Sequence, residues 1–97
     1  TNIKNITNPI EKVNRISGVS FDWKDNQSIY KGRDVGVIAQ ELQEVMPELV
    51  EEGKVGLRVK YEKITPLLIE SIKDQQKKIE YLEDKIMELS SAIDKLK

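Results

Sequence analysis

The sequence predicts an α+β fold that is mainly helical, with a small globular head and a long C-terminal helix. Isoleucine and leucine, with Gln75 as the one polar member of the row, recur every three or four residues in the last third of the chain. Short alternating segments typical of strands precede them. A chain of 97 residues suffices for one small domain with a helical extension. We therefore divide it into a head, residues 1–65, and a coiled-coil helix, residues 66–97, which act as one functional domain.

The head is expected to begin with a short helix and a strand. Asn8 and Pro9 predict the helix start, because an asparagine can cap free amides and proline fits the first helical position. Gly18 is the predicted end of this helix. From Val19 to Trp23 apolar and polar residues alternate, which predicts a half-buried strand. We interpret the two aromatic residues of this strand as core; stacking on a sugar or a base is the alternative.

A turn and a second helix follow. Residues 25–28 predict a turn, and residues 35–38 form a short apolar run interrupted by Gly36. Residues 39–46 carry apolar side chains at helical spacing, and Pro47 is expected to end that helix.

A hairpin and the last helix complete the chain. Two apolar segments, 49–50 and 55–59, flank Gly53, which predicts a hairpin in which Gly53 supplies a positive φ. Thr65 and Pro66 predict the start of the last helix, with Pro66 in its first turn as the alternative to a cap at Thr65.

The last helix carries a heptad array. Its a positions are Ile72, Ile79, Ile86 and Ile93, and its d positions are Leu68, Gln75, Leu82, Leu89 and Leu96. An apolar stripe of average period 3.5 buries best against identical helices in a supercoil. Because a lone helix would leave the stripe in water, we expect an oligomer. The alternative is an amphipathic helix that packs on its own domain.

The identity of the core residues bears on the number of helices. Isoleucine at a with leucine at d favours a parallel pair. Gln75 would form a buried polar layer that lowers stability and fixes register. Lys78 at g faces Glu83 at e of a parallel neighbour, an exposed attraction worth about 0.2–1 kcal/mol.

Composition argues against several classes of function. Sixteen basic and 17 acidic residues leave a net charge of −1, which gives no general attraction to nucleic acid or to anionic lipid. Histidine and cysteine are absent, so the commonest general base, the commonest transition-metal ligand and disulfides are absent too. No apolar run reaches the roughly 18 residues of a membrane span. We predict no cofactor, metal, nucleic-acid or membrane partner.

Individual residues that suggest a site also have a structural interpretation. A role for Gly36 in close backbone packing is favoured over phosphate binding, which needs a glycine-rich run. Gln40, Glu41 and Glu44 are interpreted as a solvated face or subunit contact rather than as metal ligands. The lysines of residues 73–78 are interrupted by an acidic residue, so nucleic-acid binding is weakly supported.

Three blocks of sequence carry a resemblance to a known family. They are residues 18–24, residues 36–50, and residues 59–61 with 64–73; the motif positions are Gly36, Ala39, Gln40, Glu41, Pro47 and Tyr61. Together they resemble the C-terminal intramolecular chaperone domain of phage tail spikes and tail fibres, the endosialidase type, with a related domain in myelin regulatory factor. The resemblance covers the chain from about Ile3 to Leu82.

The resemblance implies a homotrimer that follows a long fibrous stalk, brings three chains into register and is then cut off by self-cleavage. In the family a serine attacks the preceding carbonyl and a lysine acts as its base. That serine–lysine pattern is not in this sequence, since the family lysine would fall immediately before Thr1. We assign no catalytic residue and expect this chain not to cleave itself. We prefer the family's trimer to the pair of helices, because the head also packs around the axis.

The expected function is trimerisation and folding assistance for an N-terminal stalk in cis, in the host cytoplasm during virion assembly, with the precursor belonging to the virion tail. One alternative is a permanent structural trimerisation module at a fibre tip. Another is an active self-cleaving endopeptidase, which requires the upstream serine and lysine. We expect the loop 25–34 or the hairpin around Gly53 to contact the stalk.

Overall fold

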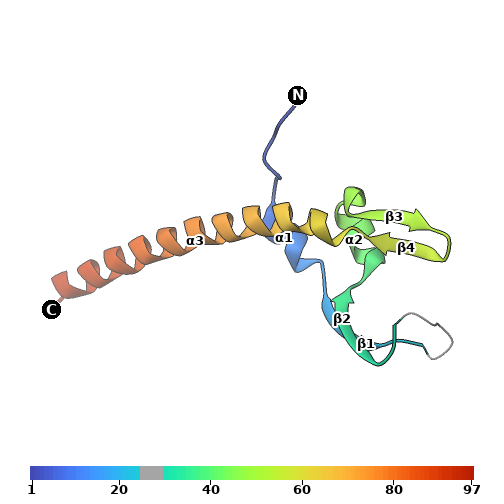
Figure 1. Cartoon of the computed structure of the whole chain (residues 1–97). Helices are drawn as coiled ribbons and strands as arrows, with labels where there is room; N and C mark the ends of the chain where they lie inside the picture. The colour runs from blue at the N-terminus through green and yellow to red at the C-terminus, as the bar shows by residue number, and fades with distance from the viewer. Residues whose placement is uncertain (25–29) are drawn as a thin grey trace.

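The computed structural model describes residues 1–24 and 30–97, and the turn predicted at residues 25–28 lies outside them. The elements in chain order are α1 (Pro9–Asn14), β1 (Gly18–Asp22), β2 (Arg33–Val37), α2 (Ala39–Val45), the 3-10 turn η1 (Pro47–Leu49), β3 (Val50–Gly53), β4 (Gly56–Val59) and α3 (Tyr61–Lys95). The predicted mainly helical α+β class with a long C-terminal helix is confirmed. The short elements gather around the first half of α3, and the rest of α3 projects away from them (Figure 1).

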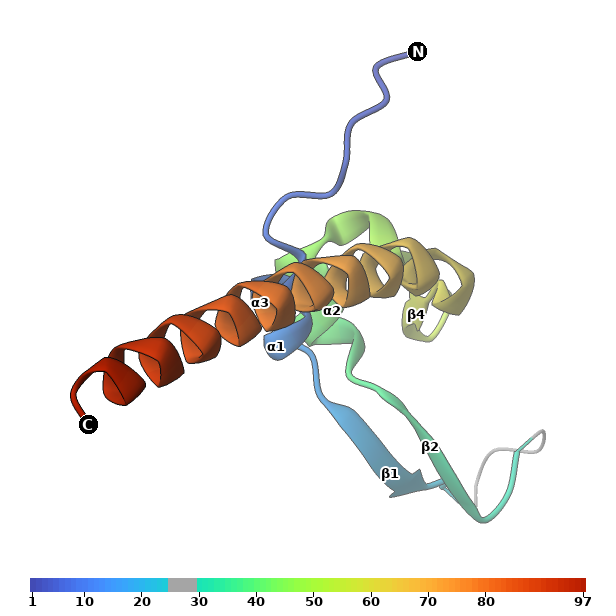
Figure 2. The ribbon, with the colours of Figure 1, turned by 90° about the vertical axis from the view of Figure 1, so that its left-hand side faces the viewer.

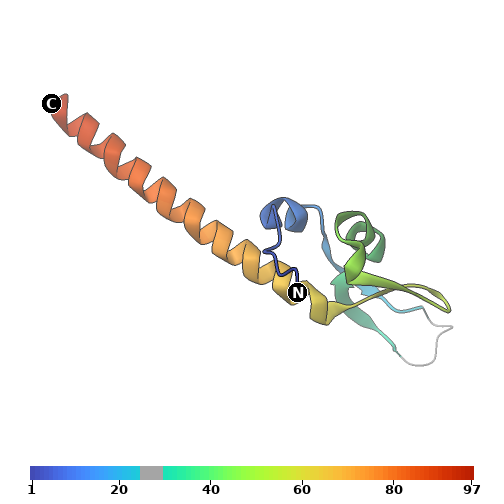
Figure 3. The same cartoon turned by 90° about the horizontal axis from the view of Figure 1, so that it is seen from above.

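The molecule is strongly elongated. Its extents are 70 × 40 × 18 Å and its radius of gyration is 20.2 Å, whereas a compact domain of this length has a radius of gyration of about 13 Å. Seen from above, no other element lies beside the second half of α3 (Figure 3). The β1–β2 hairpin extends to one side of α3, and the N-terminal segment leaves on the other (Figure 2). The shape therefore leaves half of a long helix without intramolecular packing.

The core is small and lies where four elements meet. Leu42 of α2, Leu49 of η1, Val50 of β3 and Leu67 of α3 are between 0% and 8% exposed. Partly buried residues surround this cluster: Ile6, Val13, Ile16, Val37, Ala39, Met46, Val59 and Ile64. With Pro9 of α1, those four are the only buried apolar residues in the part of the chain that the structure describes. Small domains of this kind often need additional burial from a partner.

Each sheet is a two-stranded antiparallel hairpin. The β1–β2 ladder confirms the strand that was predicted around Val19, whose side chains alternate between half-buried and exposed. The hairpin predicted around Gly53 is also confirmed, with Gly53 opposite Gly56. The positive φ, however, is 125° at Gly56 rather than at Gly53. The loop consists of residues 54–55 alone. Gly56, the first residue of β4, has the positive φ, which glycine adopts without steric cost.

The first helix begins at Pro9 as predicted, but Asn8 does not cap it. Asn8 has φ 49° and its side chain makes no hydrogen bond to the helix. A capping asparagine normally has an extended backbone that directs its oxygen at the first amides; the left-handed backbone of Asn8 does not. The helix ends at Asn14 rather than near Gly18, which instead opens β1.

The last helix begins at Tyr61, five residues before Pro66. Pro66 lies inside the helix, where it has no N–H to donate to the carbonyl of Glu62. Ile64 and Leu67 pack into the head on either side of this position, and their burial offsets the lost hydrogen bond. The first turns of α3 are therefore part of the head's core, and the functional boundary at residue 65 stays a prediction.

Candidate functional site: the apolar stripe of α3

The heptad positions of α3 form one continuous exposed surface. Its apolar members are Leu68, Ile72, Ile79, Leu82, Ile86, Leu89, Ile93 and Leu96, which are between 45% and 87% exposed. Gln75 lies in the same row and is exposed as well. We call these nine residues the stripe. Apart from Gln75 the exposed surface is apolar along its whole length, and exposed apolar surfaces of this size are typical of interaction sites.

The head packs on the neighbouring face of the same helix. Ile64, Leu67, Ser71 and Asp74 are buried or half-buried, and α1 is the element that contacts α3 most extensively. Leu67, Ser71 and Asp74 each come one residue before a member of the stripe. One residue turns an α-helix by about 100°, so the stripe lies about 100° around the helix from the face that the head covers. The stripe therefore stays open. The alternative in which the stripe packs on its own domain is therefore wrong for the single chain.

Three polar residues at or beside the stripe, Gln75, Lys78 and Glu83, have no partner among the described residues. The Gln75 amide makes no hydrogen bond there, and neither Lys78 nor Glu83 forms an ion pair. The next glutamine differs, since Gln76 Nε2 donates to Glu80 Oε1 at 3.1 Å. The bonding capacity of Gln75, Lys78 and Glu83 is thus available to solvent or to a neighbouring molecule.

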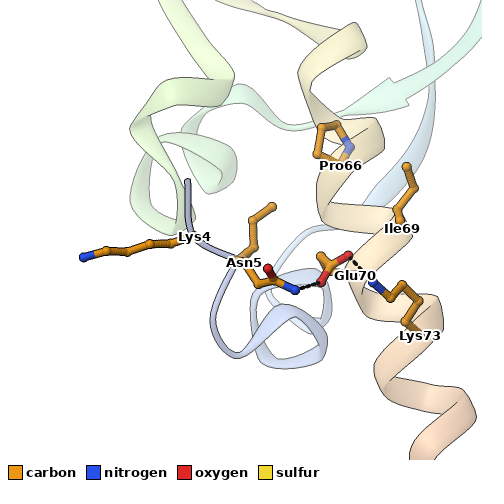
Figure 4. Close-up of a pocket in the computed structure, with 7 residues that line it drawn as sticks. Lys4, Asn5, Pro66, Ile69, Glu70 and Lys73 are labelled. Atoms are coloured by element: carbon orange, nitrogen blue, oxygen red, sulfur yellow. Dashed lines mark hydrogen bonds and ion pairs between the residues drawn. The ribbon is translucent and has the colours of Figure 1, made fainter. Parts of the chain in front are cut away.

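A hydrogen bond holds the N-terminal segment against the side of α3 that faces away from the stripe. Asn5 Nδ2 donates to Glu70 Oε1 at 3.0 Å, and Lys73 Nζ contacts Glu70 Oε2 at 3.2 Å (Figure 4). These residues line an open hollow of about 370 Å³ together with Lys4, Ile6, Pro66 and Ile69. Asn5 and Glu70 are 65 positions apart, and no local pattern could have paired them. The contact fixes where the N-terminal segment leaves the head.

The β1–β2 hairpin carries an aromatic group of its own. Trp23 contacts Phe21 edge-on, with ring centroids 5.1 Å apart, and stacks on Tyr30 at 4.7 Å. Trp23 Nε1 donates to Asp34 Oδ2 at 3.0 Å. Two hydrogen bonds to the Asp34 carboxylate lower its pKa below the usual value. The larger effect comes from the backbone N–H of Val35 and the smaller one from the side-chain N–H of Trp23. Phe21 and Trp23 are half-buried and lie outside the core cluster, so their interpretation as core is wrong.

Two motif residues join the hairpin to the start of α3. A Cβ at Gly36 would lie 2.6 Å from Tyr61 Oη, and Val37 N–H donates to the same oxygen at 3.4 Å. The close packing predicted for Gly36 is confirmed.

The remaining motif residues are structural or exposed. Ala39 opens α2, where it packs on the core, and Pro47 opens η1, so the second helix ends before it as predicted. Glu41 accepts hydrogen bonds from Ser17 N at 2.8 Å and from Ser17 Oγ at 3.2 Å, a contact that sequence analysis missed. Gln40 is exposed on α2.

The described residues hold neither a candidate metal site nor a candidate membrane-spanning helix. Within residues 1–24 and 30–97, no group of three or more histidine, cysteine, aspartate or glutamate side chains could hold a metal ion. None of the helices described is both long enough and apolar enough to cross a membrane.

Comparison with known proteins identifies the family. The family described as "Chaperone of endosialidase" matches residues 1–51, more than half of the 97 residues. The long tail fiber protein Gp37 of Enterobacteria phage K3 is 33% identical over 97 aligned positions, which cover 90% of this chain and 8% of that protein. Its counterpart from Enterobacteria phage T2 is also 33% identical, over 90% of this chain and 7% of the relative. The chain therefore spans less than a tenth of these curated relatives, and it belongs to the chaperone of endosialidase family.

Proposed function

We propose that this chain is an intramolecular chaperone that joins three copies of an N-terminal phage fibre or spike stalk and helps that stalk to fold. The observation that carries this proposal is the stripe, which runs from Leu68 to Leu96 and is uncovered in the single chain. Three parallel copies of α3 would bury it and would also add to a core that is small for a domain.

The trimer would help the stalk to fold by reducing the entropy that three stalk chains lose when they assemble. Tethering three chains at one end raises their effective concentration to roughly millimolar, so strand pairing in the stalk becomes nearly intramolecular. The trimer also sets register before slow, non-local β pairing begins. The N-terminal segment, held on α3 by the Asn5–Glu70 hydrogen bond, is where the stalk would join each subunit.

Family membership supports a trimer rather than a pair of helices, and supports release by a cut upstream of this chain. We propose that this cut uses a serine and a lysine outside the chain, and that assembly takes place in the host cytoplasm before the fibre joins the virion tail. A permanent trimerisation module at a fibre tip is the competing function, and it requires the domain to stay attached to the mature fibre.

A stalk contact is also proposed for one of two loops. One is the loop 25–34; the other is the tip of the β3–β4 hairpin, where Val55 is fully exposed. Deleting residues 26–33 should lower the yield of trimeric stalk if the first loop makes the contact. An unchanged yield would assign the contact to the hairpin instead, for which Val55→Asp is the corresponding test.

The decisive experiment expresses the native precursor, stalk included. We would compare wild type with Ile79→Asp/Ile86→Asp, which breaks the stripe, and with Tyr81→Asp/Met87→Asp, which adds the same charge outside it. Trimeric stalk should be lost in the first variant and kept in the second. Equal stalk yields in all three proteins would reject the proposal. Mass spectrometry of the mature fibre separates the two functions, since a domain that remains covalently attached identifies the permanent module.

A further inference from the structure

We propose that the head of each copy also binds the next copy of this chain. The hollow beside the β1–β2 hairpin of one copy receives the flank of α3 that carries Ile69 in its neighbour. The inference rests on the proposed function, because it needs parallel copies joined along the stripe. It adds a second interface between the same copies.

An open, apolar hollow lies where the β1–β2 hairpin meets the start of α3. It has a volume of about 590 Å³ and is lined by residues 18–20, residues 35–37 and Tyr61. None of these residues is charged. Val35 is 73% exposed and Tyr61 is 54% exposed, so this hollow presents apolar surface that the described residues of the chain leave in water.

Tyr61 connects the hairpin hollow to the stripe. It lies seven residues before Leu68, in the same row of the heptad pattern, and its Oη accepts a hydrogen bond from the N–H of Val37 at 3.4 Å. Copies that associate in parallel along the stripe reach the hairpin hollow when the same row continues for about two more helical turns. The two apolar surfaces are therefore continuous.

A second exposed apolar surface lies on the flank of α3 that the head does not cover. Ile69 is 50% exposed and does not belong to the stripe. With Pro66 it lines the open hollow of about 370 Å³ beside the N-terminal segment (Figure 4). The hairpin and the N-terminal segment lie on opposite sides of α3 (Figure 2), so the two hollows do not meet within one chain.

Heptad geometry brings these two flanks together between copies. In parallel helices a g position faces an e position of the neighbour, and Ile69 is the e position that follows Ile64, at g, by five residues. Ile64 is half-buried against the core of the head. The head of each copy therefore lies against the Ile69 flank of the next copy. The hairpin of each copy then adjoins the N-terminal segment of the next, where the stalk would join.

Cysteine cross-linking tests this arrangement, because the chain has no cysteine of its own. Two full chains that differ in mass by a tag, one with Val35→Cys and one with Ile69→Cys, are refolded together and treated with a short bismaleimide. We expect a covalent heterodimer linked through positions 35 and 69. The control pairs Val35→Cys with Met87→Cys, which lies 18 residues, or about 27 Å, farther along α3 and should give no product.

A second control adds Ile79→Asp/Ile86→Asp to both chains. This change breaks the stripe and should remove the 35–69 product, since the product requires assembled copies. A product that survives in this background comes from chance collisions and counts against the interface.

Sedimentation equilibrium measures the contribution of the contact. Burial of the exposed half of Ile69 is worth about a factor of 5 to 30 per contact, and a trimer has three such contacts. Ile69→Asp should therefore lower the trimer association constant about 100-fold or more. Tyr81→Asp is the matched control, because Tyr81 is 61% exposed on the same helix but lies outside both hollows; it should leave the association constant nearly unchanged.

The outcomes separate this interface from the proposed function. A trimer that gives no 35–69 product, or gives equal yields with positions 69 and 87, overturns the contact between head and neighbour and leaves the trimer intact. The same holds if Ile69→Asp associates as strongly as Tyr81→Asp. A wild-type chain that sediments as a monomer overturns the proposed function, and this contact with it.

Discussion

Replacing Ile79 and Ile86 by aspartate should dissociate the proposed trimer, and the exposure of the two side chains sets the scale of the lost association energy. Ile79 is 50% exposed and Ile86 is 64% exposed in the single chain, so at least half of each side chain remains to be buried on association. Full burial of an isoleucine contributes about 1.5–3 kcal/mol, so the remaining part is worth about 1–2 kcal/mol per side chain. Three chains meet in each layer, so the two layers hold six such side chains, and removing them forfeits about 6–12 kcal/mol.

The introduced carboxylates weaken association further. Three aspartates in one layer would repel each other and would lose hydration without gaining a partner. Even the lower limit of the apolar term corresponds to more than about three orders of magnitude in the association constant, at 1.4 kcal/mol for each factor of ten. A micromolar sample of the double variant should therefore be monomeric.

Sedimentation equilibrium over a range of concentrations measures this directly. The matched control is Tyr81→Asp/Met87→Asp, since Tyr81 and Met87 are 61% and 69% exposed but lie outside the stripe. The control carries the same number of new charges on the same helix and should keep the trimer mass. Trimers in the Ile79/Ile86 variant, or equal dissociation of both variants, would show that the stripe is not the interface.

Three further predictions concern the head. Leu67→Ala removes a side chain that is 0% exposed and should lower the free energy of unfolding by about 2–5 kcal/mol in urea titrations; a loss below 1 kcal/mol would contradict its place in the core. Gly36→Ala should destabilise the protein by about 1–3 kcal/mol, because the new Cβ meets Tyr61 Oη at 2.6 Å, and Tyr61→Phe should recover part of that loss; equal losses with and without the hydroxyl would exclude this clash. The pKa of Asp34 is lowered from 3.8, so its contacts stabilise the hairpin above pH 3.8 and are lost as the pH falls through the lowered value. Fluorescence of Trp23, the one tryptophan, should report this acid transition below pH 3.8, and a transition that persists in Asp34→Asn would assign it to another group.

Local patterns in the sequence predicted the stripe, the second helix and the β3–β4 hairpin. For the β1–β2 hairpin they predicted the first strand but not its pairing with β2. The stripe was predictable because a 3.5-residue repeat places its members on one face of any helix, whatever surrounds it. The second helix and the β3–β4 hairpin were predictable for the same reason, since proline, glycine and apolar spacing act over only a few residues. The family resemblance also rested on such contiguous blocks, and the comparisons confirm it.

Long-range contacts decided what the local patterns did not. The sequence predicted that the last helix starts at Thr65 or Pro66, but α3 begins at Tyr61. The helix continues through Pro66 because burial of Leu67 in the head outweighs one missing backbone hydrogen bond. Asn5 is bonded to Glu70 across 65 positions, a pairing that depends on how α1 and α3 pack. The tertiary structure also decided which face of α3 the head covers, and so which face remains open. Periodicity fixes the spacing of side chains along a helix, but only packing against the rest of the chain determines which of them stay in contact with water.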